Sequence, residues 1–368
     1  MALHKTPSRK RKRLIAGMIA GLMTVGAAVG VATASAHGGF YYTGGGSDRG
    51  DRSDRDRDRG GDRDRDRDQD DQSPEEDLLA PPSEDFYVDI QDVEPNAGDL
   101  ELAASPGRFV TRCGRNEERH LNSANVVISP GVFNGAQHVH DYVGNLTTTE
   151  KSDNRSLAAG DTTCRFGDRS TYYWPVVREL GVQGADQNQP GGAVDGNVGR
   201  ILTPAEVTVE FRGNAEDKVS PMPRFLRGVT GDAKAVTNGD DNVNAQWTCT
   251  GFEDRRTTQY PICPEGSSLM RILDFPGCWD GENTDSDNHR DHLRFAEQDG
   301  ECPRGTRAVP QLRYTLVYDA PNEVQGFALD SFPEEAHNPK TDHAAFINVM
   351  PRRLMNFAVR CINSGRSC

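Results

Sequence analysis

The chain has 368 residues and a formal net charge of −14 at pH 7, with 42 Lys and Arg against 56 Asp and Glu. This acidic balance argues against nucleic acid as a partner, because proteins that bind a polyanion carry basic patches that neutralise its phosphates.

Residues 1–36 have the pattern of a secretory signal peptide. Lys5 and the five basic residues at 9–13 precede an apolar run over 14–31, and Ala34-Ser35-Ala36 fits the small-x-small cleavage rule. An uncleaved signal anchor is the alternative, because the apolar run is near the shortest length that spans a bilayer. We predict a secreted or cell-wall-associated protein with no membrane span after signal removal.

Residues 37–107 are predicted to be a disordered linker rich in Asp and Arg. An Asp-Arg tract fills 47–71 and has almost no apolar residues, so it cannot bury a core that would offset chain entropy. Residues 73–104 continue the linker as an acidic, proline-containing approach to the folded part.

Residues 108–368 are predicted to form a single globular domain that is mainly β and β-sandwich-like. Short β-prone runs recur between clusters of Gly, Pro, Asn and Asp. They are residues 108–113, 125–128, 206–211, 269–275, 311–318 and 326–329. Apolar and polar residues alternate in 206–211 and in part of 312–318, which indicates strands with one buried face.

One α-helix is expected at the C-terminus. Pro351 suits its first turn, and Gly365 can end it. Apolar residues share one face at helical spacing, namely Leu354, Phe357, Ala358 and Cys361.

The cysteines predict long loops pinned by disulfides. All eight lie beyond the signal: Cys113, Cys164, Cys249, Cys263, Cys278, Cys302, Cys361 and Cys368. An even number in an exported chain favours four disulfides. We predict sequential pairing, in which the first cysteine bonds to the second, the third to the fourth, and so on along the chain. No C-x-x-C pair is present, which argues against a zinc ribbon or a thioredoxin-like redox site.

Histidines gather in three short motifs that can hold a metal. His138 and His140 point to the same side if they lie on a strand, and His289 and His292 can do so in a turn or helix. With His343 they form a nitrogen set suited to a divalent metal cofactor such as zinc, copper, manganese or iron. The alternative is that these histidines bond to carboxylates and backbone and only brace loops.

Residues 271–295 are the stretch with the densest chemistry. Asp280, Asp285 and Asp287 are candidate oxygen ligands for the same metal. Asn283, Asp285 and Asp287 also alternate like the start of an EF-hand loop, but Asn288 stands where the turn glycine belongs. A different calcium loop, or acid-base work by two carboxylates, stays open as an alternative.

Aromatic residues offer a candidate carbohydrate platform. Trp174, next to Tyr172 and Tyr173, and Trp279 are the residues concerned. Core packing is the alternative, because buried aromatic side chains contribute large apolar areas.

Several separated motifs together resemble a known family. They are NVVISPGVFNGAQHVHDYVGN at 125–145, STYYWPVV at 170–177, RILDFPGCWDGENTDSDNHRDHLRF at 271–295, VPQLRYTLVY at 309–318 and TDHAAFINVM at 341–350. The family is the one catalogued as domain of unknown function nineteen ninety-six, and the resemblance covers nearly all of residues 109–361. It implies an extracellular or cell-wall role and assigns no catalytic residue. The positions that match the family motifs are His138, His140, Asp274, Cys278, Trp279, Asp280, Asp285, His289, His292 and His343.

Three hypotheses follow, and they leave open whether the protein is an enzyme. The first is polysaccharide binding or modification through a His/Asp site that holds a divalent metal. The second is a non-catalytic structural or matrix protein of the cell envelope, whose His/Asp motifs only brace loops. The third is a metal scavenger without a sugar ligand.

Overall fold

The computed structural model describes residues 80–98 and 100–368. The predicted signal peptide and the Asp-Arg tract lie outside the described residues. The described part is mainly β, as expected, with two five-stranded sheets.

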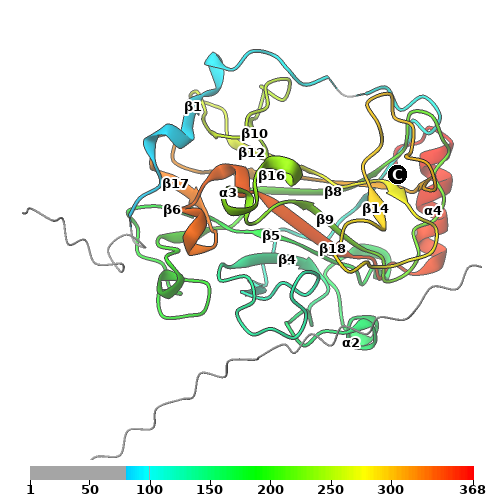
Figure 1. Cartoon of the computed structure of the whole chain (residues 1–368), viewed down its shortest axis with the longest axis horizontal. Helices are drawn as coiled ribbons and strands as arrows, with labels where there is room; N and C mark the ends of the chain where they lie inside the picture. Colours follow the sequence, from blue (N-terminus) through cyan, green and yellow to red (C-terminus); the bar gives the residue numbers. More distant parts are fainter. Residues whose placement is uncertain (1–79, 99) are drawn as a thin grey trace, which may run out of the picture. The chain divides into compact units, whose positions relative to one another are not determined.

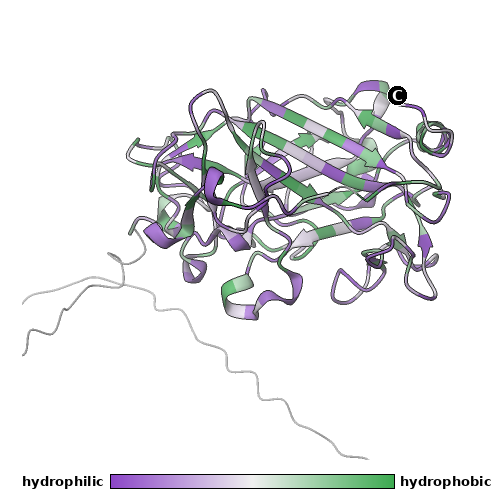
Figure 2. Cartoon of the chain, turned by 90° about the horizontal axis from the view of Figure 1, so that it is seen from above, coloured by the Kyte–Doolittle hydropathy of each residue, from purple (hydrophilic) through white to green (hydrophobic). Residues whose placement is uncertain are grey.

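The first large sheet is antiparallel throughout, in the order β10-β12-β16-β8-β2. Its strands are β10 (Gln246–Cys249), β12 (Leu269–Asp274), β16 (Gln311–Tyr318), β8 (Glu206–Arg212) and β2 (Arg108–Thr111). Along β16 every second residue is buried, and these residues are Leu312, Tyr314, Leu316 and Tyr318. Figure 2 shows apolar and polar bands following one another along the long strands, which is the pattern of a sheet with one face toward the core.

The second large sheet is also antiparallel, in the order β3-β4-β5-β18-β9. Its strands are β3 (Leu121–Asn122), β4 (His140–Gly144), β5 (Thr171–Pro175), β18 (His343–Ile347) and β9 (Arg227–Gly231). Every residue of β4, β5 and β18 is buried, so both faces of the sheet centre are covered. Polar side chains on these strands must therefore bond to protein groups or to a ligand.

The two sheets pack face to face through aromatic side chains. The ring of Tyr314 on β16 lies edge-on to Trp174 and Tyr172 on β5, with centroids 5.5 and 6.0 Å apart. Phe275, which follows β12, meets Phe346 on β18 at 5.2 Å. Such pairs each contribute about 0.5–1.5 kcal/mol beyond the area they bury. The expected sandwich is thus present, with β8, β12 and β16 in one layer and β4 and β5 in the other (Figure 1).

Smaller elements surround the two sheets. The three-stranded sheets are β14 (Leu293–Arg294), β13 (Cys278–Trp279) and β15 (Arg307–Ala308), and β17 (Phe327–Leu329), β6 (Val177–Glu179) and β7 (Arg200–Leu202). A parallel pair joins β1 (Tyr87–Asp89) to β11 (Tyr260–Ile262). The α-helices are α2 (Asn154–Ala159), α3 (Ala235–Asn238) and α4 (Arg352–Asn363). Short 3-10 helices cover Glu84–Phe86, Ile90–Asp92, Arg165–Gly167, Ala193–Asp195, Asp240–Asn242, Pro333–Glu335 and Pro339–Thr341.

The C-terminal helix is confirmed, but its buried face differs from the expected one. α4 begins after Pro351, and Gly365 follows it with φ +73°, a conformation that glycine adopts easily. The buried side chains are Met355, Ala358, Val359, Cys361 and Ile362. Phe357 is 45% exposed. Successive residues of an α-helix are about 100° apart around its axis, so the Phe357 side chain points away from the face on which Ala358 is buried.

Two further expectations need correction. Residues 125–128 form turns instead of a strand, because the Asn125 side chain accepts a hydrogen bond from the amide of Ile128 and its carbonyl accepts one from Ser129. The linker expected over 37–107 does not extend to 107, because Tyr87 pairs with Tyr260 across β1 and β11 and Ile90 is fully buried. The apolar residues at 86–90 give this segment a place in the core that its acidic average composition hides.

Four disulfides brace the loops in the sequential pattern. They join Cys113 to Cys164, Cys249 to Cys263, Cys278 to Cys302 and Cys361 to Cys368. Within the described residues, none of the helices has the length and apolar character needed to cross a bilayer.

Candidate metal centre

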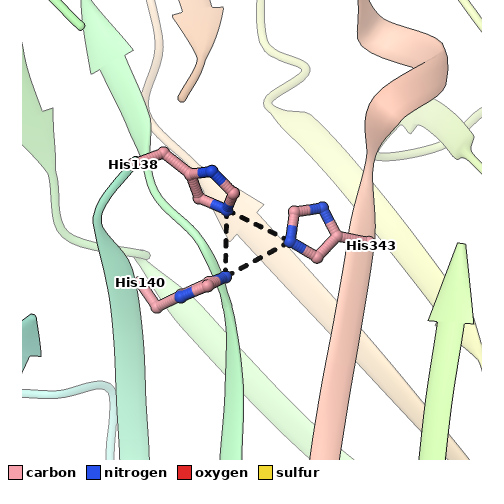
Figure 3. Close-up of side chains that lie close together, drawn as sticks. All are labelled: His138, His140 and His343. Atoms are coloured by element: carbon pink, nitrogen blue, oxygen red, sulfur yellow. Dashed lines mark hydrogen bonds between the residues drawn. The ribbon is translucent and has the colours of Figure 1, made fainter. Parts of the chain in front are cut away.

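Three imidazole rings from distant parts of the chain meet inside the second sheet. His140 begins β4, His138 lies two residues before it, and His343 begins β18. The Nε2 atom of His138 lies 3.1 Å from that of His140 and 3.2 Å from that of His343, and the last two are 3.2 Å apart. Figure 3 shows the three rings pointing their Nε2 atoms at a common point.

The hydrogen bonds of the Nδ1 atoms determine whether the Nε2 atoms, which face one another, carry a hydrogen. Nδ1 of His140 lies 2.9 Å from the Ala124 carbonyl oxygen, and Nδ1 of His343 lies 2.9 Å from that of Thr341. A carbonyl can only accept, so both Nδ1 atoms donate and both Nε2 atoms hold lone pairs in the neutral rings. Two lone pairs therefore face each other at 3.2 Å, an arrangement that a cation bound between them stabilises.

A proton could replace the metal ion between the Nε2 atoms, but burial disfavours a protonated, charged imidazole. His138 and His140 are completely buried and His343 is 5% exposed. Loss of hydration lowers the pKa of all three rings below the usual value for histidine, for His138 and His140 by a large amount. Nδ1 of His138 is buried and makes no hydrogen bond of good geometry, although the backbone at Ala136 is close enough to raise the pKa slightly.

The spacing fits a metal ion. An ion at the usual zinc-nitrogen distance of about 2.0–2.1 Å from each Nε2 would see the three nitrogens about 100° apart, close to tetrahedral. Neutral imidazole suits zinc and copper best among the common divalent ions. Three protein ligands leave a fourth position open, which is the arrangement of catalytic zinc sites.

A buried ion pair holds His343 in place. Asp342 accepts hydrogen bonds from Nε and Nη2 of Arg271 on β12, at 3.1 and 2.5 Å, and both side chains are fully buried. Arg271 also donates to the Pro175 carbonyl at the end of β5. The pair thereby joins the two sheets at the residue next to His343 and fixes where β18 begins.

A second buried ion pair holds the His138–His140 segment. Asp330 accepts a hydrogen bond from the Val139 amide at 3.1 Å and pairs with the buried guanidinium of Arg178. Arg178 also pairs with Asp186, whose carboxylate oxygens lie 2.9 and 2.7 Å from its two Nη atoms. The backbone between the two histidines is therefore fixed by a charge network, which limits ring movement.

A cavity of about 540 Å³ reaches the three-histidine cluster through His343. Phe332, whose ring packs edge-on against His138 at 5.2 Å, lines the same cavity. Asp232, His289 and Arg290 lie on its wall. The cluster is thus buried and lies beside a cavity that can hold a substrate, with His343 as the shared residue.

The remaining predicted histidine ligands lie outside the cluster. His289 lines the cavity, and its Nδ1 is 2.8 Å from Oδ1 of Asp285. His292 is buried, with Nε2 2.8 Å from the Arg227 carbonyl and Nδ1 2.9 Å from the Ser286 hydroxyl. With both ring nitrogens bonded to protein, His292 has none left for a metal, and it braces the loop.

Two of the three predicted carboxylate ligands, Asp280 and Asp285, have protein partners, and the third, Asp287, is exposed. Asp280 accepts hydrogen bonds from the amides of Glu282 and Asn283 and from the Asn283 side chain, which lowers its pKa despite some desolvation. Asp285 holds His289 and also faces Arg227 at 3.6 Å. These contacts organise the 278–302 loop and provide no calcium site of the kind considered above.

The expected carbohydrate platform is wrong. Trp174 is fully buried in the core between the sheets, and Trp279 is 8% exposed with its Nε1 donating to the Asn283 carbonyl. Tyr172 and Tyr173 are also fully buried. Side chains without exposed ring faces cannot stack on sugars, so the packing alternative holds for all four.

One other group of possible ligands occurs in the described part of the chain, at Cys113, Cys164 and Asp168. The two cysteines form a disulfide, and Asp168 accepts from Ser170, Tyr172 and Thr111. Neither sulfur is a thiolate, so the three-histidine cluster is the candidate centre.

Several residues that shape the site escaped sequence reasoning. Arg271, Asp342, Arg178 and Asp330 position the ligands, and Phe332 lines the cavity. Arg271 offered one signal, since an arginine in the middle of an apolar strand sequence needs a buried partner. Nothing in the sequence names that partner.

Comparison with known proteins agrees with this picture at the level of the family. Curated proteins and solved structures gave no match to the chain. Residues 125–348, more than half of the chain, match the family described as Domain of unknown function (DUF1996). This range contains all three clustered histidines and both ion pairs that hold them. The chain therefore belongs to the DUF1996 family.

Proposed function

We propose that this protein is exported, that it holds one divalent metal ion on His138, His140 and His343, and that it modifies an extracellular polysaccharide at that ion. The single observation that carries the metal is the 3.2 Å approach of the Nε2 atoms of His140 and His343 in a buried site, with the Nδ1 atom of each ring against a backbone carbonyl. Zinc or copper fits the three neutral imidazoles.

Export is supported by the sequence and by the cystines. The basic, apolar and small-residue pattern of residues 1–36 is that of a signal peptide, and the four disulfides suit an oxidising compartment.

A polysaccharide is supported by the surroundings of the centre. Phe133 is 73% exposed and lines a second cavity of about 300 Å³, together with Asn122, Glu150 and Asp186. An exposed aromatic ring beside amides and carboxylates offers a sugar both a stacking face and hydrogen-bond partners. The loop that carries Phe133 also contributes Ser129 and Gly135 to the cavity beside His343. A chain bound along this loop would thus pass close to the metal.

Elemental analysis tests the metal. The full chain, purified without chelators, is expected to hold about one zinc or copper ion per molecule by mass spectrometry of the digested protein. His140→Gln should lose it, whereas His120→Gln should keep it, because His120 lies outside the cluster and bonds to the Thr148 carbonyl. Wild-type protein without metal after incubation with zinc and copper salts would overturn the proposal.

Retention on insoluble polysaccharides tests the sugar. Phe133→Ala should reduce retention on whichever of chitin, cellulose, β-glucan or xylan binds the wild type. The matched control is Phe166→Ala, a comparably exposed ring in the turn at Arg165–Gly167. Equal retention of wild type and Phe133→Ala on all four would remove the sugar-binding role of this loop.

A non-catalytic envelope protein is the second candidate, and the many braced loops favour it. It predicts that His140→Gln lowers the melting temperature of the apoprotein and changes nothing else. A variant with wild-type melting and no metal would contradict it.

A further inference from the structure

We propose that His289, held by Asp285, is the residue that moves protons at this metal centre, and that the reaction is hydrolysis of an acyl ester carried by a sugar. The inference rests on the proposed metal centre and adds to it a catalytic residue and a class of substrate bond.

The hydrogen bonding of the His289 ring leaves its Nε2 able to accept a proton. Its Nδ1 lies 2.8 Å from Oδ1 of Asp285, and an ionised carboxylate only accepts, so Nδ1 carries the hydrogen. Its Nε2 then holds a lone pair, and no described residue bonds to it. The side chain is 21% exposed and lines the same cavity as His343. A base oriented by a carboxylate and open to the substrate space is the pattern of general acid-base catalysis.

The loop that carries His289 is fastened beside the metal ligands. Arg290 donates from Nη2 to the Gly231 carbonyl at 2.7 Å, and Gly231 is the cross-strand partner of His343. Asp285 is steadied from the same strand by Arg227, whose Nε lies 3.6 Å from Oδ2. Both ends of the His289 segment are therefore fixed to β9, the strand that neighbours His343.

The residues around the cavity favour an ester over a glycosidic bond. Glycoside hydrolysis uses two carboxyl groups on either side of the bond. Asp232 is the one carboxylate among the residues that line this cavity, and its oxygens accept from the Lys234 amide and the Asn238 side chain. One metal ion and one histidine base instead suit the attack of water on a carbonyl carbon.

The proposed step is balanced without any change of oxidation state. A metal ion held by the three histidines would lower the pKa of a water molecule in the cavity. Nε2 of His289 would take one proton from that water, and the remaining hydroxide would add to the ester carbonyl carbon. The bond from that carbon to the sugar oxygen then breaks, and the oxygen takes the proton from Nε2. The products are a carboxylic acid and a free sugar hydroxyl. Asp285 stays ionised and stabilises the imidazolium between the two transfers.

The experiment uses the full chain loaded with zinc and two probes, p-nitrophenyl acetate and acetylated xylan. His289→Gln should lower kcat by about 10²-fold or more, the usual contribution of a general acid or base, and leave KM, metal content and melting temperature near wild type. Asp285→Asn should give a smaller loss of kcat, because the base remains and only its ion-pair partner is gone. His120→Gln should behave as wild type, because it lies outside the centre.

Chemical rescue separates proton transfer from a structural role. With acetylated xylan as the probe and the rate without enzyme subtracted, 4-methylimidazole should restore part of the rate of His289→Ala, because a small base can enter the space left by the ring. It should not raise the rate of wild type. A His289→Gln enzyme that holds zinc and cleaves both probes at the wild-type rate would overturn the role of His289. Zinc-loaded wild type that cleaves neither probe would overturn the ester assignment, whereas wild type that holds no metal would overturn the metal centre itself.

Discussion

The histidines at the start of β4 and β18 differ from those of the 278–302 loop in what their second ring nitrogen contacts. His140 and His343 give Nδ1 to a backbone carbonyl and leave Nε2 facing other imidazoles. His292 has both nitrogens bonded to protein groups, and His289 gives one to Asp285 and leaves one in the cavity. By residue type and spacing alone, all of these histidines look like metal ligands. Their hydrogen bonds distinguish the candidate ligands from the histidine that stabilises the loop and from the proposed base.

The largest effect is expected from breaking the support of the ligand group. Asp342→Asn leaves the Arg271 guanidinium buried without its charge partner, and breaking a buried pair costs about 3–5 kcal/mol. Chemical denaturation should show this loss in the free energy of unfolding. Arg294→Gln is the control, because its pair with Asp291 is exposed, and such pairs contribute about 0–1 kcal/mol. Equal effects of the two variants would show that the buried pair does not hold the site together.

The second effect is stabilisation by the metal, which distinguishes the histidines of the cluster from those of the 278–302 loop. A ligand that binds the native state at 100 times its Kd raises the free energy of unfolding by about 2.7 kcal/mol. Zinc or copper should therefore raise the melting temperature of wild type and of His292→Gln. The metal should have no such effect on His138→Gln, whose ring belongs to the cluster. Stabilisation of His138→Gln equal to that of wild type would place the metal elsewhere.

The third effect concerns His292, which stabilises the 278–302 loop. His292→Ala removes the hydrogen bonds to the Arg227 carbonyl and the Ser286 hydroxyl, and leaving buried partners unpaired costs about 1–3 kcal/mol. Thermal unfolding of the apoprotein should show the loss, with metal content unchanged. Loss of metal together with stability would mean that the loop and the cluster are coupled more tightly than the separate hydrogen bonds indicate.

How far the sequence could predict this arrangement depended on the range of the contacts. Alternation placed the strands at 206–211 and 311–318, because the period of two is a local property of the chain. The spacing of His138 and His140 likewise put their rings on one side. His343 joins them only because β5 pairs with both β4 and β18, and no local pattern states which strands become neighbours.

Long-range contacts also explain the failures. Trp174 looked available to a sugar because its neighbours are aromatic, yet the facing sheet covers it with Tyr314. His292 had the spacing of a ligand, but the Arg227 carbonyl from β9 occupies its Nε2. In both residues the decisive partner lies far away in the sequence, at a position that only the packing of the sheets brings near.

The smallest effect is expected in the dependence of apoprotein stability on pH. Burial lowers the pKa of His138, His140 and His343 below the usual 6.5, so below about pH 6.5 the unfolded chain binds protons that the native state does not. Stability of the metal-free protein should therefore fall as the pH falls below this value. Replacing all three rings by Gln should remove this part of the slope.

A neighbouring carboxyl group makes the net effect small. Burial raises the pKa of Asp141 to about 6, so its native state binds a proton more readily than the unfolded chain does. Stability that Asp141 costs at neutral pH is thus regained as the pH falls through 6, which opposes the histidine contribution. The measurement is therefore the difference in melting temperature between wild type and the triple Gln variant, both without metal, at several values from about pH 7.5 to 5. The difference should change steadily to the disadvantage of wild type as the pH falls, because the Asp141 contribution is common to both proteins and cancels. A constant difference would mean that the three rings take up protons in the native state, and that a proton instead of a metal ion can occupy the space between their Nε2 atoms.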